Sequence, residues 1–445
     1  MNSHISRVVS VAVLLLIPAL AAFAQAPAPE PLTLRHAVEL SLERAPSLAS
    51  ARAAGAEGAA AMELARDEAF HPAAYFSTTP GYTYGLPTLV VGQVPSIFAV
   101  ELIQPIYDPV RRSSALRAEA SASSLAASFS LSCRATMESA VAAYGRAYLD
   151  GTKVDAARRR VEAAEALSAR TKALYDEGRR SELELEDATL QAARARQKLL
   201  NAESDRDLDE LELKRLIGWP GSAPLRLAGD PDLVVPELSA KENLESVRDA
   251  DPELASLRRE VDLLGRSVTI ESKRWMPTVV ASASYRRLAK FNNYDDYYQN
   301  FTPDSVAVGV SIIVPIWTGG RFEDGKRQAL ARFDRAEADL LTRESDIDMA
   351  VRRAEAAVAR SVAERSISRR ARGIADRTRS AEELLVREGR SELVALDERE
   401  MALADADDEA AQANLASLLE RTHLLSLRGE LGTALLGAEP PCAAR

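Results

Sequence analysis

The sequence predicts a mainly α-helical protein built from two structural repeats, each of which also contributes strands to a membrane β-barrel. Three observations predict this fold class. Four sequence landmarks recur in the same order at a nearly constant offset. Helical patterns at 110–175 and 322–387 are far longer than an ordinary globular helix of ~11–12 residues. Short segments between the helical patterns alternate branched-apolar with small or polar residues, as membrane strands do.

The N-terminus predicts an export signal over residues 1–24. Arg7 supplies positive charge, residues 8–20 form an apolar run, and Ala-Phe-Ala at 22–24 has the small-x-small cleavage pattern. The apolar run is shorter than the ~20 residues of a spanning helix, which favours removal over anchoring. Every later long stretch carries charge, so the chain leaves the cytoplasm and either stays soluble or crosses a membrane as strands.

Composition argues against several classes of function. The formal net charge of −10 weakly disfavours a nucleic-acid partner. Outside the signal, His36, His71 and His423 lie far apart in sequence, so no histidine-based metal or catalytic centre is expected. The chain shows no phosphate loop, nucleophile elbow or zinc-ligand spacing. We therefore expect neither an enzyme nor a bound cofactor.

The chain reads as two copies of one pattern, which is the first feature to test in any long sequence. The recurring landmarks are APSLAS at 45–50 with DPELAS at 251–256, Pro72 with Pro277, QPIY at 104–107 with VPIW at 314–317, and EGRRSEL at 177–183 with EGRSEL at 388–393. The predicted units are a first repeat over 25–217, a Pro/Gly-rich linker over 218–243, a second repeat over 244–436, and a tail over 437–445.

Each repeat is expected to run helix, strand, strand, long helix, helix. The first helices are predicted at 34–70 and 244–275, and Pro72 and Pro277 end them. The long helices, at ~1.5 Å per residue, would reach roughly 100 Å. Short breaks at Gly178 and Gly389 turn each long helix back into a return helix, at 181–217 and 391–436. Each repeat thus predicts an antiparallel coiled-coil hairpin in an elongated molecule.

The strand pattern is clearest at 306–315. Val306, Val308, Val310 and Ile312 form a branched-apolar face that is expected to contact lipid, and small or polar residues such as Gly309 alternate with them. Similar alternation marks 279–286 and 98–103, and 74–84 is less regular. Four strands cannot close a barrel, for which about eight are needed, and an open edge in lipid is not tolerated. Several chains must therefore share one barrel, and three would supply twelve strands.

These motifs carry a family resemblance. LTL at 32–34, APSL at 45–48, Pro72 and QPIYD at 104–108 resemble the first repeat of TolC-like outer-membrane efflux proteins. DPEL at 251–254, Pro277 and VPIWTGG at 314–320 resemble the second. The resemblance covers essentially the whole mature chain.

The resemblance implies a homotrimer in the outer membrane of a Gram-negative bacterium, with a 12-stranded barrel and an α-helical periplasmic tunnel. Such a duct passively conducts substrates from a periplasmic adaptor (a membrane fusion protein) and an inner-membrane pump of the RND or ABC type. A periplasmic coiled-coil scaffold or adaptor without a barrel is the alternative. The strand pairs distinguish the duct from the scaffold, because a pure coiled-coil protein does not need them.

The resemblance also assigns roles to the two turns. Gly178, Arg179, Gly389 and Arg390 are expected at the periplasmic tips that dock on the adaptor. Arg-containing tips depart from the Gly-Leu type of the prototype.

A gate is expected next to these tips. Asp397 and Arg390 match a carboxylate and an arginine of the family pattern, the other carboxylate position falls on Val394, and Glu392 is a candidate substitute. In the first repeat Glu184 and Asp187 are the matching acids. One carboxylate per chain would form a ring of three that attracts cations, whereas ordinary solvated helix charges are the alternative.

Overall fold

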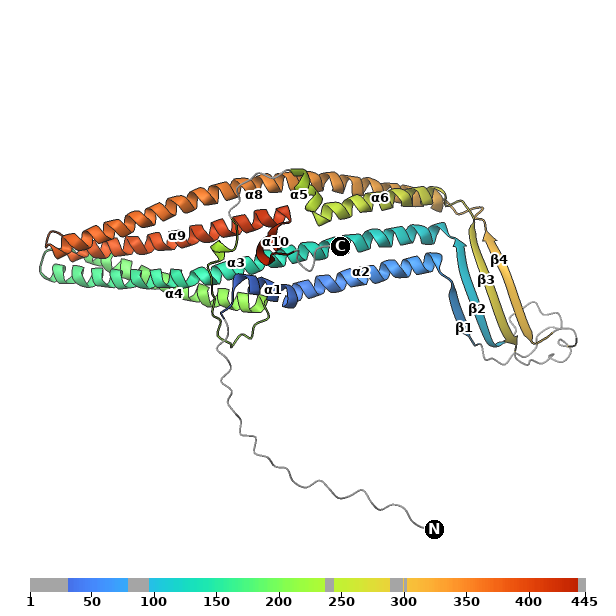
Figure 1. The fold of residues 1–445 in the computed structure, drawn as a ribbon, viewed down its shortest axis with the longest axis horizontal. Helices are drawn as coiled ribbons and strands as arrows, with labels where there is room; N and C mark the ends of the chain where they lie inside the picture. Colours follow the sequence, from blue (N-terminus) through green and yellow to red (C-terminus); the bar gives the residue numbers. More distant parts are fainter. Residues whose placement is uncertain (1–30, 79–95, 237–243, 289–298, 300–301, 439–445) are drawn as a thin grey trace, which may run out of the picture.

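The protein is a long, narrow molecule in which helices run along most of the length and a small sheet lies at one end (Figure 1). The computed structural model describes residues 31–78, 96–236, 244–288, 299 and 302–438. The expected signal at 1–24 therefore lies outside the described residues, as do part of the linker and most of the tail.

The first half of the chain follows the expected order of elements. Its elements are α1 (Leu34–Arg44), α2 (Pro46–Phe70), β1 (Ala73–Ser77), β2 (Ser96–Tyr107), α3 (Pro109–Asp176) and α4 (Glu182–Leu216). Helix α3 contains 68 residues, which at ~1.5 Å per residue is about 100 Å. A short 3₁₀ turn, η1 (Pro231–Leu233), lies in the linker.

The second half repeats this order. Its elements are α5 (Leu244–Ala250), α6 (Pro252–Ser272), β3 (Thr278–Leu288), β4 (Asp304–Ile313), α8 (Arg321–Arg387), α9 (Leu393–Arg428) and α10 (Leu431–Leu436). The helices preceding β1 and β3 end before Pro72 and Pro277, as expected.

The expectation of one continuous first helix in each repeat was wrong. Both helices divide at the residue before a proline, because that residue is pushed out of the helical region and proline is favoured at the first helical position. Ala45 is extended (φ −61°, ψ 123°) and α2 begins at Pro46. Asp251 is likewise extended, and its side chain caps α6 by accepting from the backbone N–H of Leu254 at 2.7 Å.

The last helix also differs from the expected span of 391–436. It stops at Arg428, because Gly429 adopts a left-handed conformation (φ 77°) that closes the helix end. The short helix α10 then folds back toward the middle of the molecule (Figure 1).

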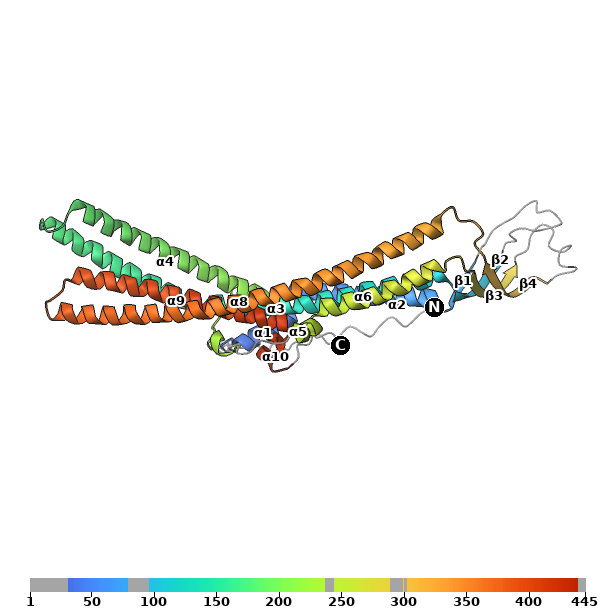
Figure 2. The ribbon, with the colours of Figure 1, turned by 90° about the horizontal axis from the view of Figure 1, so that it is seen from above.

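The helices form a single curved layer. In the half away from the sheet the neighbours run α4–α3–α9–α8, and in the half next to the sheet they run α2–α3–α6–α8. Helices α3 and α8 cross both halves, and the two hairpins point the same way (Figures 1 and 2). Within the described ranges, none of the helices is both long enough and apolar enough to pass through a membrane.

Small residues allow the long helices to approach closely. The buried layer between α3, α4 and α9 includes Ala163, Ala164, Ala192 and Ala195, with Leu167 and Met401 among its few larger side chains. The strongest apolar packing lies midway along the molecule, where α1, α3, α4, α9 and α10 meet. There the Tyr144 hydroxyl donates to the carbonyl of Ala228 at 2.7 Å, which ties the linker to α3. Burial raises the pKa of Tyr144 to about 12.

The sheet is antiparallel, with strand order β1-β2-β3-β4. Strands β2 and β3 pair the first half of the chain with the second over ten registered positions from Ser96↔Leu288 to Tyr107↔Val279. Strands β1 and β4 are the outer strands of this sheet, so among the described residues each has one edge without a neighbouring strand.

Candidate functional sites

The two hairpin turns have the same geometry. Gly178 (φ 76°) and Gly389 (φ 67°) each end a long helix in the left-handed conformation that glycine tolerates best. The next backbone N–H reaches back to close the turn, from Arg179 to Leu174 at 2.8 Å and from Arg390 to Leu385 at 2.8 Å. Both glycines are exposed, and both turns lie at the end of the molecule opposite the sheet (Figure 1).

The tip arginines connect the two hairpins. Arg179 and Arg180 lie 3.6 and 3.4 Å from the carboxylate of Glu392, which belongs to the other hairpin. Among the residues that the structure describes, Arg390 pairs only with a near neighbour, Glu388, at 3.2 Å. Two gate candidates, Glu392 and Arg390, therefore lie within the exposed tip region.

Glu184 is a helix-capping residue. Its carboxylate accepts from the backbone N–H of Ser181 at 2.8 Å, and Ser181 caps the helix in return. The Ser181 backbone bond, followed by the hydrogen bond from Arg180, lowers the pKa of Glu184 to about 2. Asp187, one turn further on, is exposed and accepts a hydrogen bond from Gln191 at 2.7 Å.

Asp397 lies apart from these residues, in the seam between the hairpins. Its side chain is only 8% exposed and is paired with Arg170 of α3, whose guanidinium also donates to the carbonyl of Leu393 at 3.1 Å. Burial raises the pKa of Asp397, and the charge of Arg170 opposes that effect. The gate candidates thus do not form one cluster in the single chain, and their role in a pore stays a prediction.

Sequence reasoning missed two acids that continue this seam along α9. Asp405 pairs with Arg160 of α3 and, at 3.3 Å, with Lys198 of α4. Asp407, whose side chain is 6% exposed, is held at 2.5 Å by both Arg159 of α3 and Arg372 of α8.

The signal for the seam was present in the residue numbers. The residue numbers rise along α3 through Arg159, Arg160 and Arg170, while those of their partners on α9 fall through Asp407, Asp405 and Asp397, as in an antiparallel helix pair. A search for complementary charges in that register would have found it.

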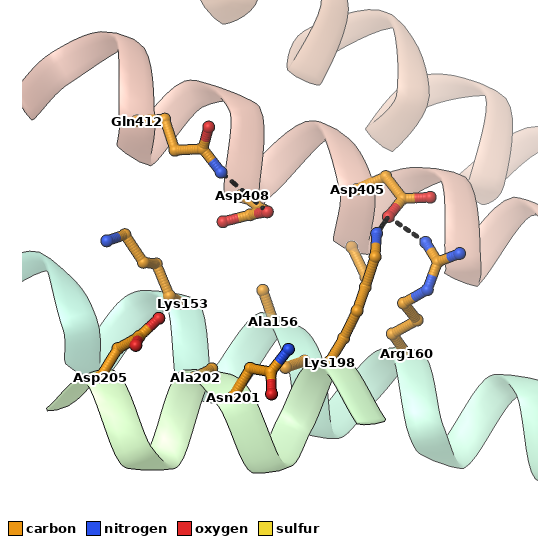
Figure 3. A pocket seen from close by; sticks show the side chains of 12 residues that line it. Lys153, Ala156, Arg160, Lys198, Asn201, Ala202, Asp205, Asp405, Asp408 and Gln412 are labelled. Atoms are coloured by element: carbon orange, nitrogen blue, oxygen red, sulfur yellow. Dashed lines mark hydrogen bonds and ion pairs between the residues drawn. The ribbon is translucent and has the colours of Figure 1, made fainter. Parts of the chain in front are cut away.

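A groove of about 240 Å³ opens beside this seam, between α3, α4 and α9. Figure 3 shows that alanines form part of its lining and that charged side chains of both signs surround it. Lys198 and Arg160 converge on Asp405, and Gln412 donates to Asp408 at 3.1 Å (Figure 3). The groove is polar, open and balanced in charge, which suits contact with another helix better than catalysis.

The strand register gathers apolar residues onto one face of the sheet. Directly opposed residues of antiparallel strands share a face. Val306, Val308, Val310 and Ile312 of β4 oppose Tyr285, Ala283, Ala281 and Val279 of β3, and Tyr285 and Ala283 in turn oppose Val100 and Leu102 of β2. The four β4 side chains are 60–81% exposed. Whether this face contacts lipid is not decided by the single chain and stays a prediction.

No group of three or more His, Cys, Asp or Glu side chains suited to a metal ion occurs among the described residues. The fold is distinguished instead by three features. It has two long helical hairpins, a small sheet with one exposed apolar face, and polar hairpin tips.

Comparison with known proteins identifies the class. Residues 243–430, which include most of the predicted second repeat, match the sequence model of the outer membrane efflux protein family. This part of the chain is similar to the family that the paired motifs indicated, and the match favours an outer-membrane location. The family is a class of transport proteins, not of enzymes.

Among individual proteins, the chain is 32% identical over 146 residues to the alkaline protease secretion protein AprF of Pseudomonas aeruginosa. That match covers 32% of this chain and spans 29% of the length of AprF.

Solved structures share the fold over most of the chain. The outer membrane protein VceC of Vibrio cholerae has a TM-score of 0.70 at 16% identity, covering 89% of this chain and 96% of VceC. The MtrE outer membrane channel of Neisseria gonorrhoeae has a TM-score of 0.67 at 18% identity, covering 89% of each chain.

Proposed function

We propose that this protein is the outer-membrane exit duct of a tripartite efflux or type I secretion system, which passively conducts substrates from a periplasmic adaptor and an inner-membrane pump to the outside. The observation that carries the proposal is the shape of the chain: a one-layer wall with two different open edges. One edge is made by β1, α2 and α4, and the other by β4 and α8.

A wall with unlike edges assembles head to tail, and such an interface closes into a ring by cyclic symmetry. The strands set the number of copies. Three chains supply the twelve strands of a barrel with an open lumen. Two chains would supply eight strands, and side chains fill the interior of an eight-stranded barrel. Two of the edge helices carry exposed apolar side chains, including Leu200 (67%) and Leu208 (61%) on α4 and Leu341 (67%) and Ile367 (66%) on α8. Contact between copies would cover them.

The same assembly gives each predicted site a role. The face of Val306, Val308, Val310 and Ile312 would contact membrane lipid, because an apolar outer face is what a bilayer requires. The turns at Gly178 and Gly389 would form the periplasmic end of the duct. Their exposed arginines, Arg179 and Arg390, would meet the adaptor.

The matching order of elements in the two halves supports the proposed duplication over 25–217 and 244–436, with a linker at 218–243. The four-stranded sheet weighs against the alternative of a periplasmic scaffold, because a coiled-coil scaffold has no use for strands with an exposed apolar face.

Photo-crosslinking between copies tests the assembly. Leu200 on α4 and Ile367 on α8 lie at similar distances from the hairpin tips, 18 residues after the start of α4 and 20 before the end of α8. A benzophenone amino acid at Leu200 should crosslink to an α8 peptide near Ile367 of another chain and yield trimers in the outer-membrane fraction. The same probe at Glu409, exposed on the central helix α9, is the matched control. Recovery of the chain as a soluble periplasmic monomer would remove the proposal.

Within this function, the similarity to AprF favours protein secretion over small-molecule efflux as a candidate. Deleting the gene and complementing it should then restore an exported protein in the culture medium. If complementation restores only resistance to small toxic compounds, the efflux branch is the correct one.

A further inference from the structure

A second pocket lies where the helices meet the sheet, and no role proposed above uses it. It is formed between α2, α3 and α6 and has a volume of about 500 Å³, within the ~300–1,000 Å³ usual for small-molecule sites. Phe70, Leu116 and Ile270 give it an apolar surface, and the arginines Arg66, Arg112 and Arg266 also line it.

The three arginines differ in how they are paired. Arg66 lies 3.0 Å from Glu119, and Arg266 lies 2.7 Å from Asp262. Arg112 has no carboxylate partner among the described residues. Its Nη2 donates to the carbonyl of Ile106 at 3.3 Å, and its buried Nε has no hydrogen-bond partner within the described part of the chain.

Two aromatic rings hold the guanidinium of Arg112 in place. Its central carbon lies 4.9 Å from the ring centre of Tyr107 and 5.5 Å from that of Phe70. Stacking of this kind fixes a cation without neutralising it. The pocket therefore contains one positioned positive charge beside an apolar surface.

The strand register shows on which side of the wall this charge lies. A bulge between Pro105 and Tyr107 places Tyr107 opposite Val279, and Val279 is opposite Ile312. Tyr107 consequently shares the apolar face of the sheet, the face proposed to contact lipid. Because Arg112 stacks on Tyr107, it lies on that side of the molecule too.

Exposed aromatic residues mark the level of the pocket along the molecule. Trp275, just before β3, is 65% exposed, and Trp317, just after β4, is 88% exposed. Exposed tryptophans flanking membrane segments are typical of the boundary between hydrocarbon and headgroups. The pocket adjoins the same end of the strands, which in the proposed placement of the sheet is the depth of the lipid phosphates.

We propose that this pocket binds a membrane phospholipid. The phosphate accepts hydrogen bonds from Arg112 and Arg66, and the first part of an acyl chain lies over Phe70, Leu116 and Ile270. Arginine forks match phosphate oxygens in geometry and charge, and basic pockets between membrane-adjacent helices are known to take lipid headgroups. The inference rests on the proposed placement of the sheet in the outer membrane.

Native mass spectrometry of the full-length assembly, released from nanodiscs of phosphatidylethanolamine and phosphatidylglycerol, measures the bound lipid directly. The wild-type assembly should retain about one phospholipid per chain. Arg112→Gln should lower the affinity about tenfold, the usual loss for one charge-assisted contact. Arg327→Gln is the matched control, because Arg327 lies near the sheet end of α8, is 75% exposed, and is outside the pocket. It should retain lipid as the wild type does.

Two further measurements distinguish loss of lipid from a folding defect, and a lipid phosphate from free phosphate. Arg112→Lys keeps the stacked charge but loses the fork, so it should assemble normally and retain less lipid than wild type. Millimolar inorganic phosphate should not displace the lipid. Equal retention by wild type and Arg112→Gln, or displacement by inorganic phosphate, would overturn the lipid assignment while leaving the duct intact. A chain that never enters the nanodisc would overturn both the lipid site and the proposed duct.

Discussion

The assignment of the sheet faces yields a sharp prediction at Val308 and Ala307. Strand β4 has 10 residues, which at about 3.3 Å each extend roughly 33 Å and, tilted by about 40°, span about 25 Å, the height of the apolar band of a membrane barrel. Val308 is the fifth residue of the strand, so it would lie close to mid-bilayer. It is 81% exposed in the single chain and opposes Ala283 at the middle of β3.

Val308→Lys would place a positive charge on the lipid face near the midplane. The expected cost is about 2–4 kcal/mol in the free energy of unfolding, which corresponds to roughly a 30- to 700-fold change in the folding equilibrium. Ala307→Lys introduces the same side chain one residue earlier, on the opposite face, where a water-filled lumen would leave it solvated. That variant should cost less than about 1 kcal/mol.

Folding of both variants into lipid vesicles, followed through urea titration, measures the two costs side by side. Wild type and Ala307→Lys should unfold at similar urea concentrations, whereas Val308→Lys should unfold much earlier. Equal losses would mean that neither face contacts lipid. A larger loss for Ala307→Lys would show that the two faces are assigned the wrong way round.

Three further predictions concern the helical half. Replacing Gly178 or Gly389 by Val forces a branched residue to positive φ, at a cost of about 1–3 kcal/mol, although the added Cβ meets no neighbouring atoms within 4 Å. Export should stop while trimers remain. Normal export in both variants would remove the docking role. Asp397→Ala should weaken cation preference and divalent block in single-channel recordings, and unchanged currents would show that this side chain does not face the pore. The hydrogen bond to Glu138 raises the pKa of His423 above 6.5, so its contribution to stability is present below pH 6.5 and lost as the pH rises through the folded-state pKa. His423→Gln should flatten the pH dependence of the melting temperature in that window, and an unaltered slope would contradict the assignment.

The docking and gating residues could be predicted only in part from the sequence. The Gly-containing turns were placed correctly because a left-handed glycine after a long helical pattern is a local signal. The surroundings of the acids were not predicted. Both Glu184 and Asp397 are gate candidates in the sequence; the structure adds that Glu184 caps α4 and that Asp397 is paired with Arg170, 227 residues away along the chain.

The sequence by itself determined the broad order of helices and strands, although not the division of the first helices or the separate α10, because helix periodicity, strand alternation, prolines and glycines act within a few residues of one another. It also indicated a resemblance to outer-membrane efflux proteins, through short motifs repeated in order. Only the tertiary structure decided which strands are neighbours, that Tyr107 crosses to the apolar face through a bulge, and that Arg112 stacks beside it above an apolar pocket. These features depend on contacts between segments far apart in the chain, such as β2 with β3, whose register is set by the packing of two separate halves.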